Sequence, residues 1–327
     1  SNAAAVAGSF NPTTFGYFGG GSPFSTVDRI DYSNDTATAS VRGPLSAARY
    51  GSGATGNSSF GYFGGGVSFS PTVYGITTID RIDYTNDTGT TPTRGSLSAT
   101  KYMLAATGNQ SFGYFGGGGP TTSIVDRIDY SNDTATASPK GPLSVARRAL
   151  AATGNQSSGY FGGGGVPDIS TVDRIDYSND TATAVAKGPL SVARKLLAAT
   201  GNASFGYFAG GHVDISTVER IDYSNDTATA AVKGPLSLAR RSLSATGNSD
   251  FGYFGGGVYV STVDRIDYSN DTADASPKGP LSVARHHLAA TGNSSFGYFA
   301  GSGPSGSSIV DRVDYSNDTG TAPAKGP

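Results

Sequence analysis

An internal repeat runs through almost the whole chain. The string Gly-Tyr-Phe-(Gly/Ala)-Gly recurs with its tyrosine at Tyr17, Tyr62, Tyr114, Tyr160, Tyr207, Tyr253 and Tyr298. The string Asp-Tyr-(Ser/Thr)-Asn-Asp-Thr recurs with its tyrosine at Tyr32, Tyr84, Tyr130, Tyr177, Tyr223, Tyr268 and Tyr315. The seven copies are 45 to 52 residues apart, and the longest interval contains an insert from Val67 to Thr78. A period of this length indicates stacked supersecondary units, each too small to bury its own apolar surface.

Each copy contains four short segments that end at turn residues. In the copy around Tyr114 they are 104–107, 112–115, 124–130 and 134–138, separated by Gly-Asn, a glycine run and Asn-Asp. None has the length or the 3.6-residue period of a helix. Gly-Asn and Asn-Asp are typical of hairpin turns, because these residues accept positive φ or bond to their own backbone. Each copy is therefore predicted to be a four-stranded antiparallel meander, with strands A to D.

Seven such meanders predict an all-β protein, a seven-bladed β-propeller in one domain spanning 1–327. A β-solenoid is the alternative, but its coils are usually shorter and lack four segments. The predicted blades span about 3–42, 45–94, 97–140, 143–187, 190–233, 236–278 and 281–325. Ala3 to Gly8 would supply strand A of the first blade and Thr319 to Lys325 strand D of the last, so closure would rest on packing between blades. Residues 1–3 resemble a cloning remnant, and we expect the sequence to come from a longer protein.

The composition excludes several classes of site. The chain has 48 Gly, one Met, three His, no Cys and no Trp, with a formal net charge of -2. Without Cys there is no disulfide, zinc–thiolate site, iron–sulfur cluster or cysteine nucleophile. Near-neutral charge argues against nucleic-acid binding, and no apolar run reaches the roughly 18 residues of a membrane span. We expect a monomer without cofactor or metal. It would be cytoplasmic or on a virion or cell surface, because every copy carries an Asn-Asp-Thr glycosylation sequon that a eukaryotic secretory protein would expose.

The copies resemble kelch repeats. Gly20-Gly21 matches the family's glycine pair after strand B, with Tyr17 at its tyrosine position. Val27 to Asp31 matches strand C, and Pro44 to Arg49 matches the segment that leads into the next strand A. The resemblance implies a propeller whose loops bind partners. The family's strand-D Trp is replaced by Ala37, Gly89, Ala135, Ala182, Ala228, Ala273 and Gly320. Packing between blades must then use Tyr and Phe. The repeats also look similar to those of bacterial surface proteins and marine phage virion proteins.

Most charges belong to the repeat, and we expect them to form a ring of contacts between blades and in turns. Alternation along strand C would place Arg29 beside Asp31 as a salt bridge, and Asp35 would accept bonds within its turn. The alternative is calcium binding by Asp28, Asp31 and Asp35. Their spacing does not match a calcium loop, and Glu219 replaces the first of these acids in one copy.

Positions that vary between copies fall in the B–C loops and just after the basic residue before strand A. In a meander blade the B–C and D–A connections lie on the same side of the propeller. The residues predicted to bind a partner there are Arg49, Tyr50, Lys101, Tyr102, Arg147, Arg148, Arg194, Lys195, Arg240, Arg241, Arg285, His286, Phe24, Tyr74, Asp168, His212, Asp214 and Tyr259. They would form a basic ring with interspersed aromatic residues around one mouth of the channel, on loops where binding sites usually lie. Ordinary drift at tolerant loops would give the same variation.

The sequence favours a non-enzymatic binding propeller, possibly a surface or virion adhesion module, that presents this face to a protein or glycan. An enzyme acting on an anionic substrate at the channel mouth is an alternative, with Arg147, Arg148, Arg240 and Arg241 as clamps. It lacks a recognisable acid, base or nucleophile. His286 and His287 would point oppositely on a strand, and His212 would lie on a loop. A purely architectural spacer is the third possibility.

Overall fold

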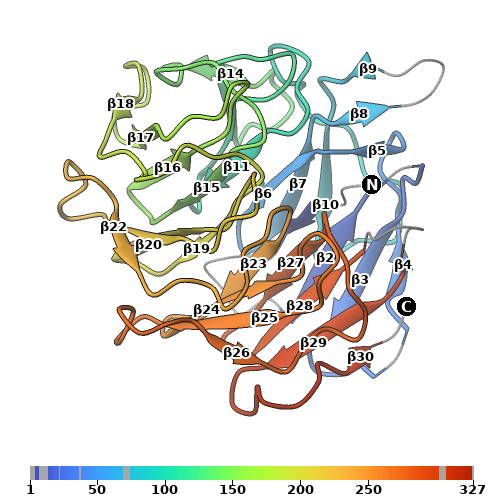
Figure 1. Ribbon diagram of the computed structural model, residues 1–327. Helices are drawn as coiled ribbons and strands as arrows, with labels where there is room; N and C mark the ends of the chain where they lie inside the picture. Colours follow the sequence, from blue (N-terminus) through green and yellow to red (C-terminus); the bar gives the residue numbers. More distant parts are fainter. Residues whose placement is uncertain are drawn as a thin grey trace.

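The chain is all-β. The computed structural model describes residues 4–6, 14–21, 23–36, 38–68, 74–301 and 307–325. These residues contain no helix, and hence none that could cross a membrane. Seven antiparallel sheets, one per sequence repeat, surround a common axis (Figure 1). The predicted seven-bladed β-propeller is confirmed.

Four strand positions recur, in the order A-B-C-D across each sheet. Strand A is β1 (Ala4–Val6), β6 (Gly53–Gly56), β11 (Ala105–Gly108), β15 (Ala151–Gly154), β19 (Ala198–Gly201), β23 (Ser244–Gly247) and β27 (Ala289–Gly292). Strand B is β2 (Phe15–Gly19), β7 (Phe60–Gly64), β12 (Phe112–Gly116), β16 (Ser158–Gly162), β20 (Phe205–Ala209), β24 (Phe251–Gly255) and β28 (Phe296–Ala300). Strand C is β3 (Val27–Asp31), β10 (Ile79–Asp83), β13 (Val125–Asp129), β17 (Val172–Asp176), β21 (Val218–Asp222), β25 (Val263–Asp267) and β29 (Val310–Asp314). Strand D is β4 (Ser40–Arg42), β14 (Ser138–Lys140), β18 (Val185–Ala186), β22 (Ala231–Lys233), β26 (Ser276–Lys278) and β30 (Ala324–Lys325). The A strands of neighbouring blades contact one another and therefore line the axis.

The second blade departs from this plan. Its strand D is reduced to a single bridge between Asp80 and Thr93. The long insert predicted from the sequence forms β8 (Val67–Ser68) and β9 (Tyr74–Gly75). These pair with β5 (Arg49–Tyr50) in a separate three-stranded sheet, so the insert extends one side of the propeller.

Tyrosine and phenylalanine side chains pack the blades together, as predicted from the absence of Trp. Tyr114 and Phe115 of β12 are fully buried. The Tyr114 ring stacks on Tyr177 of the next blade at 4.7 Å between centroids and 11° between planes. Equivalent stacks occur at all seven interfaces, at 4.6 to 5.1 Å. Phenylalanine fits against glycine: a Cβ on Gly116 would lie 2.6 Å from Phe161, so a larger residue would push the blades apart.

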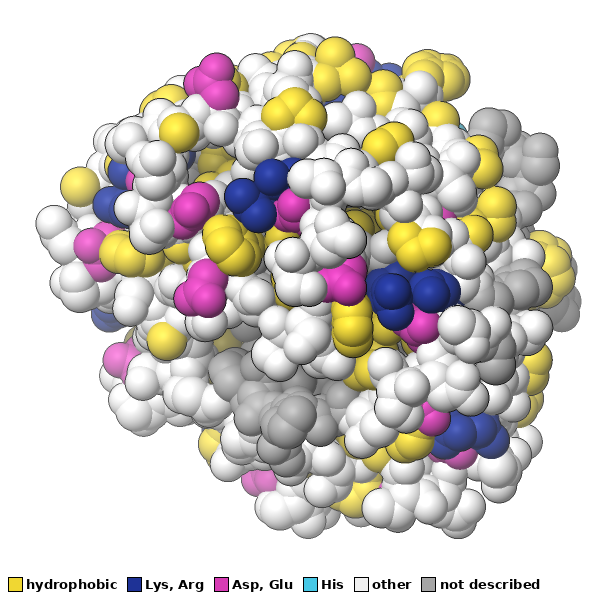
Figure 2. Space-filling view, turned by 90° about the horizontal axis from the view of Figure 1, so that it is seen from below, with side chains coloured by type: hydrophobic (Ala, Val, Ile, Leu, Met, Phe, Trp, Pro, Cys, Tyr) yellow, Lys and Arg dark blue, Asp and Glu magenta, His cyan; other side chains and the backbone are white. Residues whose placement is uncertain are grey.

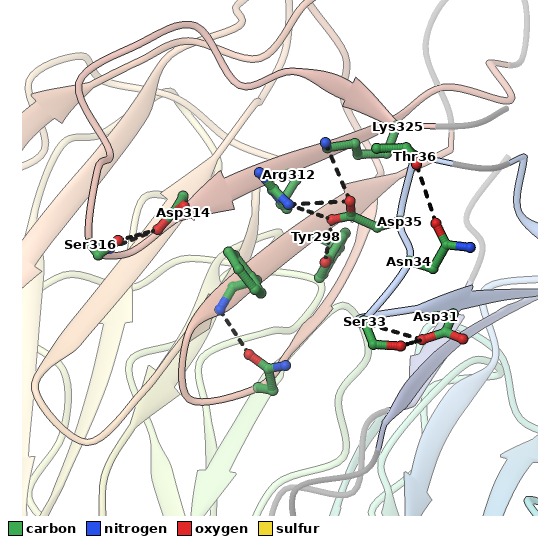
Figure 3. A network of polar contacts seen from close by, with 12 residues as sticks. Asp31, Ser33, Asn34, Asp35, Thr36, Tyr298, Arg312, Asp314, Ser316 and Lys325 are labelled. Carbon is green, nitrogen blue, oxygen red and sulfur yellow. Dashed lines mark hydrogen bonds and ion pairs between the residues drawn. The ribbon is translucent and has the colours of Figure 1, made fainter.

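The aspartate of each Asn-Asp-Thr turn joins its blade to the preceding one. Figure 3 shows Asp35 accepting from Tyr298, at 2.7 Å, and pairing with Arg312 and Lys325. The same acceptor binds one residue of strand B, one of strand C and one in or just after the strand-D position throughout the ring. The sets are Asp87 with Tyr17, Arg29 and Arg42; Asp133 with Tyr62, Arg81 and Arg94; Asp180 with Tyr114, Arg127 and Lys140; Asp226 with Tyr160, Arg174 and Lys187; Asp271 with Tyr207, Arg220 and Lys233; and Asp318 with Tyr253, Arg265 and Lys278.

Two local predictions about these charges are therefore wrong, although the predicted ring of charged contacts is confirmed. Arg29 pairs with Asp87 of the next blade and not with Asp31, because its long side chain reaches across the interface. Asp31 is the turn acceptor: it receives bonds from the backbone N–H and the hydroxyl of Ser33, at 2.9 and 2.6 Å (Figure 3). The hydroxyl bond in particular lowers the pKa of Asp31. Asp35, expected within its own turn, is the interblade acceptor.

The first and last blades close the ring without sharing a sheet. Strands β1 to β4 form one sheet and β27 to β30 another, as expected from the sequence. Tyr32 stacks on Tyr298 at 5.0 Å, and its hydroxyl bonds to Thr291 at 3.2 Å. In Figure 1 the blue first sheet lies against the red seventh one. Closure thus uses the same kind of contact as the other six interfaces.

We predict that Asp271→Asn lowers the free energy of unfolding by about 2 kcal/mol, because Tyr207, Arg220 and Lys233 lose a charged acceptor in a buried position. Asp274, three residues away, is exposed, and Asp274→Asn is the matched control, with an expected change within about 0.5 kcal/mol. Urea unfolding followed by near-ultraviolet circular dichroism measures both. Equal midpoints for the two variants would contradict a stabilising role for the interblade aspartates.

Candidate ligand-binding face

The D–A and B–C connections lie on one side of the propeller, here called the loop face. Lys195, just before β19, pairs with Asp168 of the preceding B–C loop at 2.8 Å. Arg241, before β23, pairs with Asp214 at the same distance. On the opposite side, asparagines of the A–B turns bond to the backbone of the next turn, as Asn109 does to Gln156. The arrangement expected from the meander is confirmed.

The six basic residues before strand A do not surround the mouth, and this prediction is wrong. Their side chains are at most 1% exposed and each pairs with the first acid of strand C in its own blade. The pairs are Arg49 with Asp80, Lys101 with Asp126, Arg147 with Asp173, Arg194 with Glu219, Arg240 with Asp264 and Arg285 with Asp311. Sequence reasoning gave their position along the chain but not the direction of their side chains.

Arg147 illustrates the geometry of these pairs. Its guanidinium bonds to Asp173 at 2.7 Å and to the backbone carbonyl of Phe161 at 2.9 Å. The backbone N–H of Ser144 donates to the same carboxylate. Burial lowers the pKa of Arg147, and the nearby charge of Asp173 acts against that shift. A buried pair of this kind fixes the chain path and leaves no charge for a ligand, so Arg147 and Arg240 are not available as clamps.

The next residue in each copy does reach the loop face, but the charged ones have partners. Arg148 lies over the ring of Tyr102 and donates to its hydroxyl at 3.2 Å. The Asp168 carboxylate pairs with both Lys195 and His212, the latter at 2.8 Å. Burial would raise the pKa of Asp168, but the bonds from Lys195 and His212 outweigh it and lower that pKa. Figure 2, a view from below, also shows Lys and Arg side chains next to acidic ones on that side of the molecule.

A row of five backbone hydrogen bonds runs beside a small cavity on the axis. Met103 N–H donates to Gly51, Ala149 to Met103 and Leu196 to Ala149, and the chain of bonds continues through Ser242 to His287. The members are Gly51, Met103, Ala149, Leu196, Ser242 and His287, all with φ between 52° and 67°. The cavity has a volume of about 160 Å³ and is also lined by leucines such as Leu150 and Leu197. Among the described residues that line it there is no Asp or Glu.

The B–C loops expose large apolar side chains. Phe24 is 58% exposed and Tyr259 is 85% exposed, with Tyr74 and Val213 also exposed. Val213 and Tyr259 have φ of 62° and 66°, in the left-handed region that usually suits glycine. For β-branched and aromatic residues this conformation costs about 1–2 kcal/mol. Sequence reasoning selected Tyr259 for its variability but missed Val213 and the strain, because backbone angles in irregular loops have no sequence pattern.

Across the described ranges there is no group of three or more His, Asp or Glu that could hold a metal ion. Asp31 bonds to Ser33, and Asp35 binds Tyr298 and two cations, so the acids considered for calcium serve separate purposes.

The paired histidines also differ from prediction. His286 and His287 lie in a bend before β27 and not on a strand, with their rings 5.0 Å apart and edge to face. Burial lowers the pKa of His286, with a contribution from Arg241. Burial and the neighbouring His286 lower the pKa of His287 to about 4.

Comparison with known protein families and with curated proteins gives no match for this sequence.

We predict that His287 titrates near pH 4, well below the usual value of about 6.5. The unfolded chain takes up this proton at higher pH than the folded one. The stabilising contribution of neutral His287 to the free energy of unfolding is therefore present above pH 6.5 and is lost as pH falls from about 6.5 toward 4. Heteronuclear NMR titration of the imidazole measures the midpoint. His287→Asn, which tolerates positive φ, identifies the resonance and should flatten the stability curve in this range. A midpoint near 6.5 would contradict the desolvation of this half-buried imidazole.

Proposed function

We propose that this chain is a non-enzymatic binding module, a propeller of the kelch type that engages a protein or glycan partner through the B–C loops of its loop face. The observation that carries the proposal is that Val213 and Tyr259 combine a strained backbone with a solvent-exposed side chain. Residues in left-handed backbone reduce stability, and such strain tends to occur at functional sites. Burial does not offset that strain at either residue, since the two side chains are 69% and 85% exposed.

The difference between the two sides of the propeller supports this proposal. The A–B and C–D turns repeat almost without change, and the A–B turns of neighbouring blades are joined by asparagine bonds such as Asn155 to Ala203. The B–C loops differ in length and sequence, and present Phe24, Tyr74 and Tyr259 to solvent. Exposed aromatic rings give large contact area at low entropic cost, which suits sugar rings and protein hot spots alike.

The charges on this face favour contact through apolar surface over electrostatic attraction. Lys195 and Arg241 already pair with Asp168 and Asp214, so a ligand gains little by displacing these exposed pairs. Several such loops acting together can give useful affinity from weak individual contacts. A surface or virion adhesion module is the setting that we propose for such a face.

We predict that Val213→Gly combined with Tyr259→Gly weakens binding at least tenfold without loss of stability. Glycine relieves the left-handed strain, at a cost of about 0.5–1 kcal/mol in backbone entropy, so the melting temperature should stay constant or rise. Arrays of glycans and cell-envelope proteins, read at two salt concentrations with and without calcium, would identify the ligand. The double variant would then be titrated against it.

The matched control is Val185→Ala, since Val185 is 51% exposed on β18, away from the B–C loops. It should bind like the parent chain. Unchanged binding by the double glycine variant would contradict this face, and a blank on every array would favour an architectural spacer. Cleavage of an anionic glycan would instead support the enzyme alternative.

A further inference from the structure

The cavity on the axis is lined by two consecutive residues from each of the second to seventh blades. These residues lead into strand A, so the cavity lies at the end of the axis that belongs to the loop face. The second residue of the pair is a leucine in the third to seventh blades, and each leucine is only 7 to 8% exposed. The leucines are Leu104, Leu150, Leu197, Leu243 and Leu288. They give the cavity an apolar wall.

The second blade contributes a different pair, Gly51 and Ser52. Ser52 stands where the later blades have leucine, and its shorter side chain leaves space on this side of the cavity. The Oγ of Ser52 is buried and has no hydrogen-bond partner among the described residues. A buried hydroxyl without a partner is costly, so a ligand that bonds to it gains affinity.

The charges around the cavity favour a neutral ligand. Among the described residues that line it there is no Asp, Glu, Lys or Arg. The basic residues that precede it in the sequence, such as Arg147 and Arg240, are buried in ion pairs. His287 is part of the wall, and burial together with His286 lowers its pKa to about 4, so its imidazole is neutral at pH 7. A charged ligand would lose hydration here without gaining an opposite charge.

The volume of the cavity suits a single ring. It is about 160 Å³, and an engineered cavity of about 150 Å³ lined by leucine and other apolar side chains binds benzene. Met103, the one methionine of the chain, is also part of the wall. A thioether sulfur makes favourable contacts with aromatic rings, which favours an aromatic ring over an aliphatic one.

We propose that the axial cavity binds a small phenol, with the ring against the leucines and Met103 and the hydroxyl bonded to Ser52. The ring is that of a free phenol or of a tyrosine side chain from a partner. The backbone hydrogen bonds that run from Gly51 to His287 hold the wall in place before a ligand arrives, which lowers the entropic cost of binding. This inference concerns the axis and does not depend on the function proposed for the B–C loops.

Met103 allows binding in the cavity to be observed directly. A chain labelled with ¹³C in the methionine methyl group gives one signal from this residue, and an aromatic ring lying against that methyl group changes its chemical shift. Titration with 4-fluorophenol should therefore shift the signal saturably. We expect 4-fluorophenol to bind about fivefold more tightly than fluorobenzene, which lacks the hydroxyl. The charged 4-fluorobenzoate should bind more weakly than either.

A further probe, N-acetyltyrosinamide, separates the two sources of the ring. Tighter binding than that of 4-fluorophenol assigns the site to the tyrosine side chain of a partner. Weaker binding assigns it to a free phenol, and either result supports a phenol site.

Substitutions at Ser52 separate the site from the fold. Ser52→Ala keeps the space and removes the hydroxyl, so 4-fluorophenol should bind about fivefold more weakly while fluorobenzene binds as before. Ser52→Leu gives the second blade the residue of the later blades, so the melting temperature should stay constant or rise while both ligands bind about tenfold more weakly. The matched control is Ser58→Ala, at an exposed position of the A–B turn on the opposite side, which should bind like the parent chain.

Three results would overturn the proposal. The Met103 signal would move with neither 4-fluorophenol nor N-acetyltyrosinamide, or fluorobenzene would bind the parent chain as tightly as 4-fluorophenol, or Ser52→Leu would bind 4-fluorophenol like the parent chain. None of these results depends on the glycine variants of the B–C loops, so the two proposals fail separately.

Discussion

The aspartate that follows strand C holds the propeller together. In each blade it accepts the tyrosine hydroxyl from strand B and two cations from strands C and D of the preceding blade, as Asp35 does with Tyr298, Arg312 and Lys325. Because donors and acceptor come from different blades, no single repeat can satisfy its own polar groups. A buried acceptor of this kind is costly to leave unpaired, so the network selects the stacked arrangement as well as stabilising it.

A second set of charges fixes the path between blades. The cation before strand A pairs inside its blade with the first acid of strand C. At Asp173 the backbone N–H of Ser144, from the connecting segment, bonds to the same carboxylate as Arg147. The six ion pairs are fully buried, and they include most of the basic residues that were predicted to bind a ligand. What remains for recognition is the surface of the B–C loops, where neutral and paired groups dominate.

The repeat made much of the architecture predictable. Seven copies with four turn-bounded segments specify the number of blades and their strands, and the absence of Trp correctly points to Tyr and Phe at the interfaces. Predictions about individual side chains succeeded less often. Arg29 was expected to pair with Asp31 two residues away, yet it reaches Asp87, which is 58 residues distant. Strand alternation gives the face on which a side chain lies, but it does not say which neighbouring blade that face meets.

The sequence by itself determined the strand pattern, the turns and the identity of the repeated charged positions, because these follow from local residue preferences and periodicity. Only the tertiary structure decided which charges are buried. Arg49 and Arg148 look alike in the sequence, but one is enclosed with Asp80 and the other lies over Tyr102 on the loop face. It also decided that Val213 and Tyr259 adopt left-handed backbone, since loop conformation depends on the blades that anchor both ends. The closing seam between the first and seventh blades likewise exists only in the folded ring, where residues from opposite ends of the chain meet.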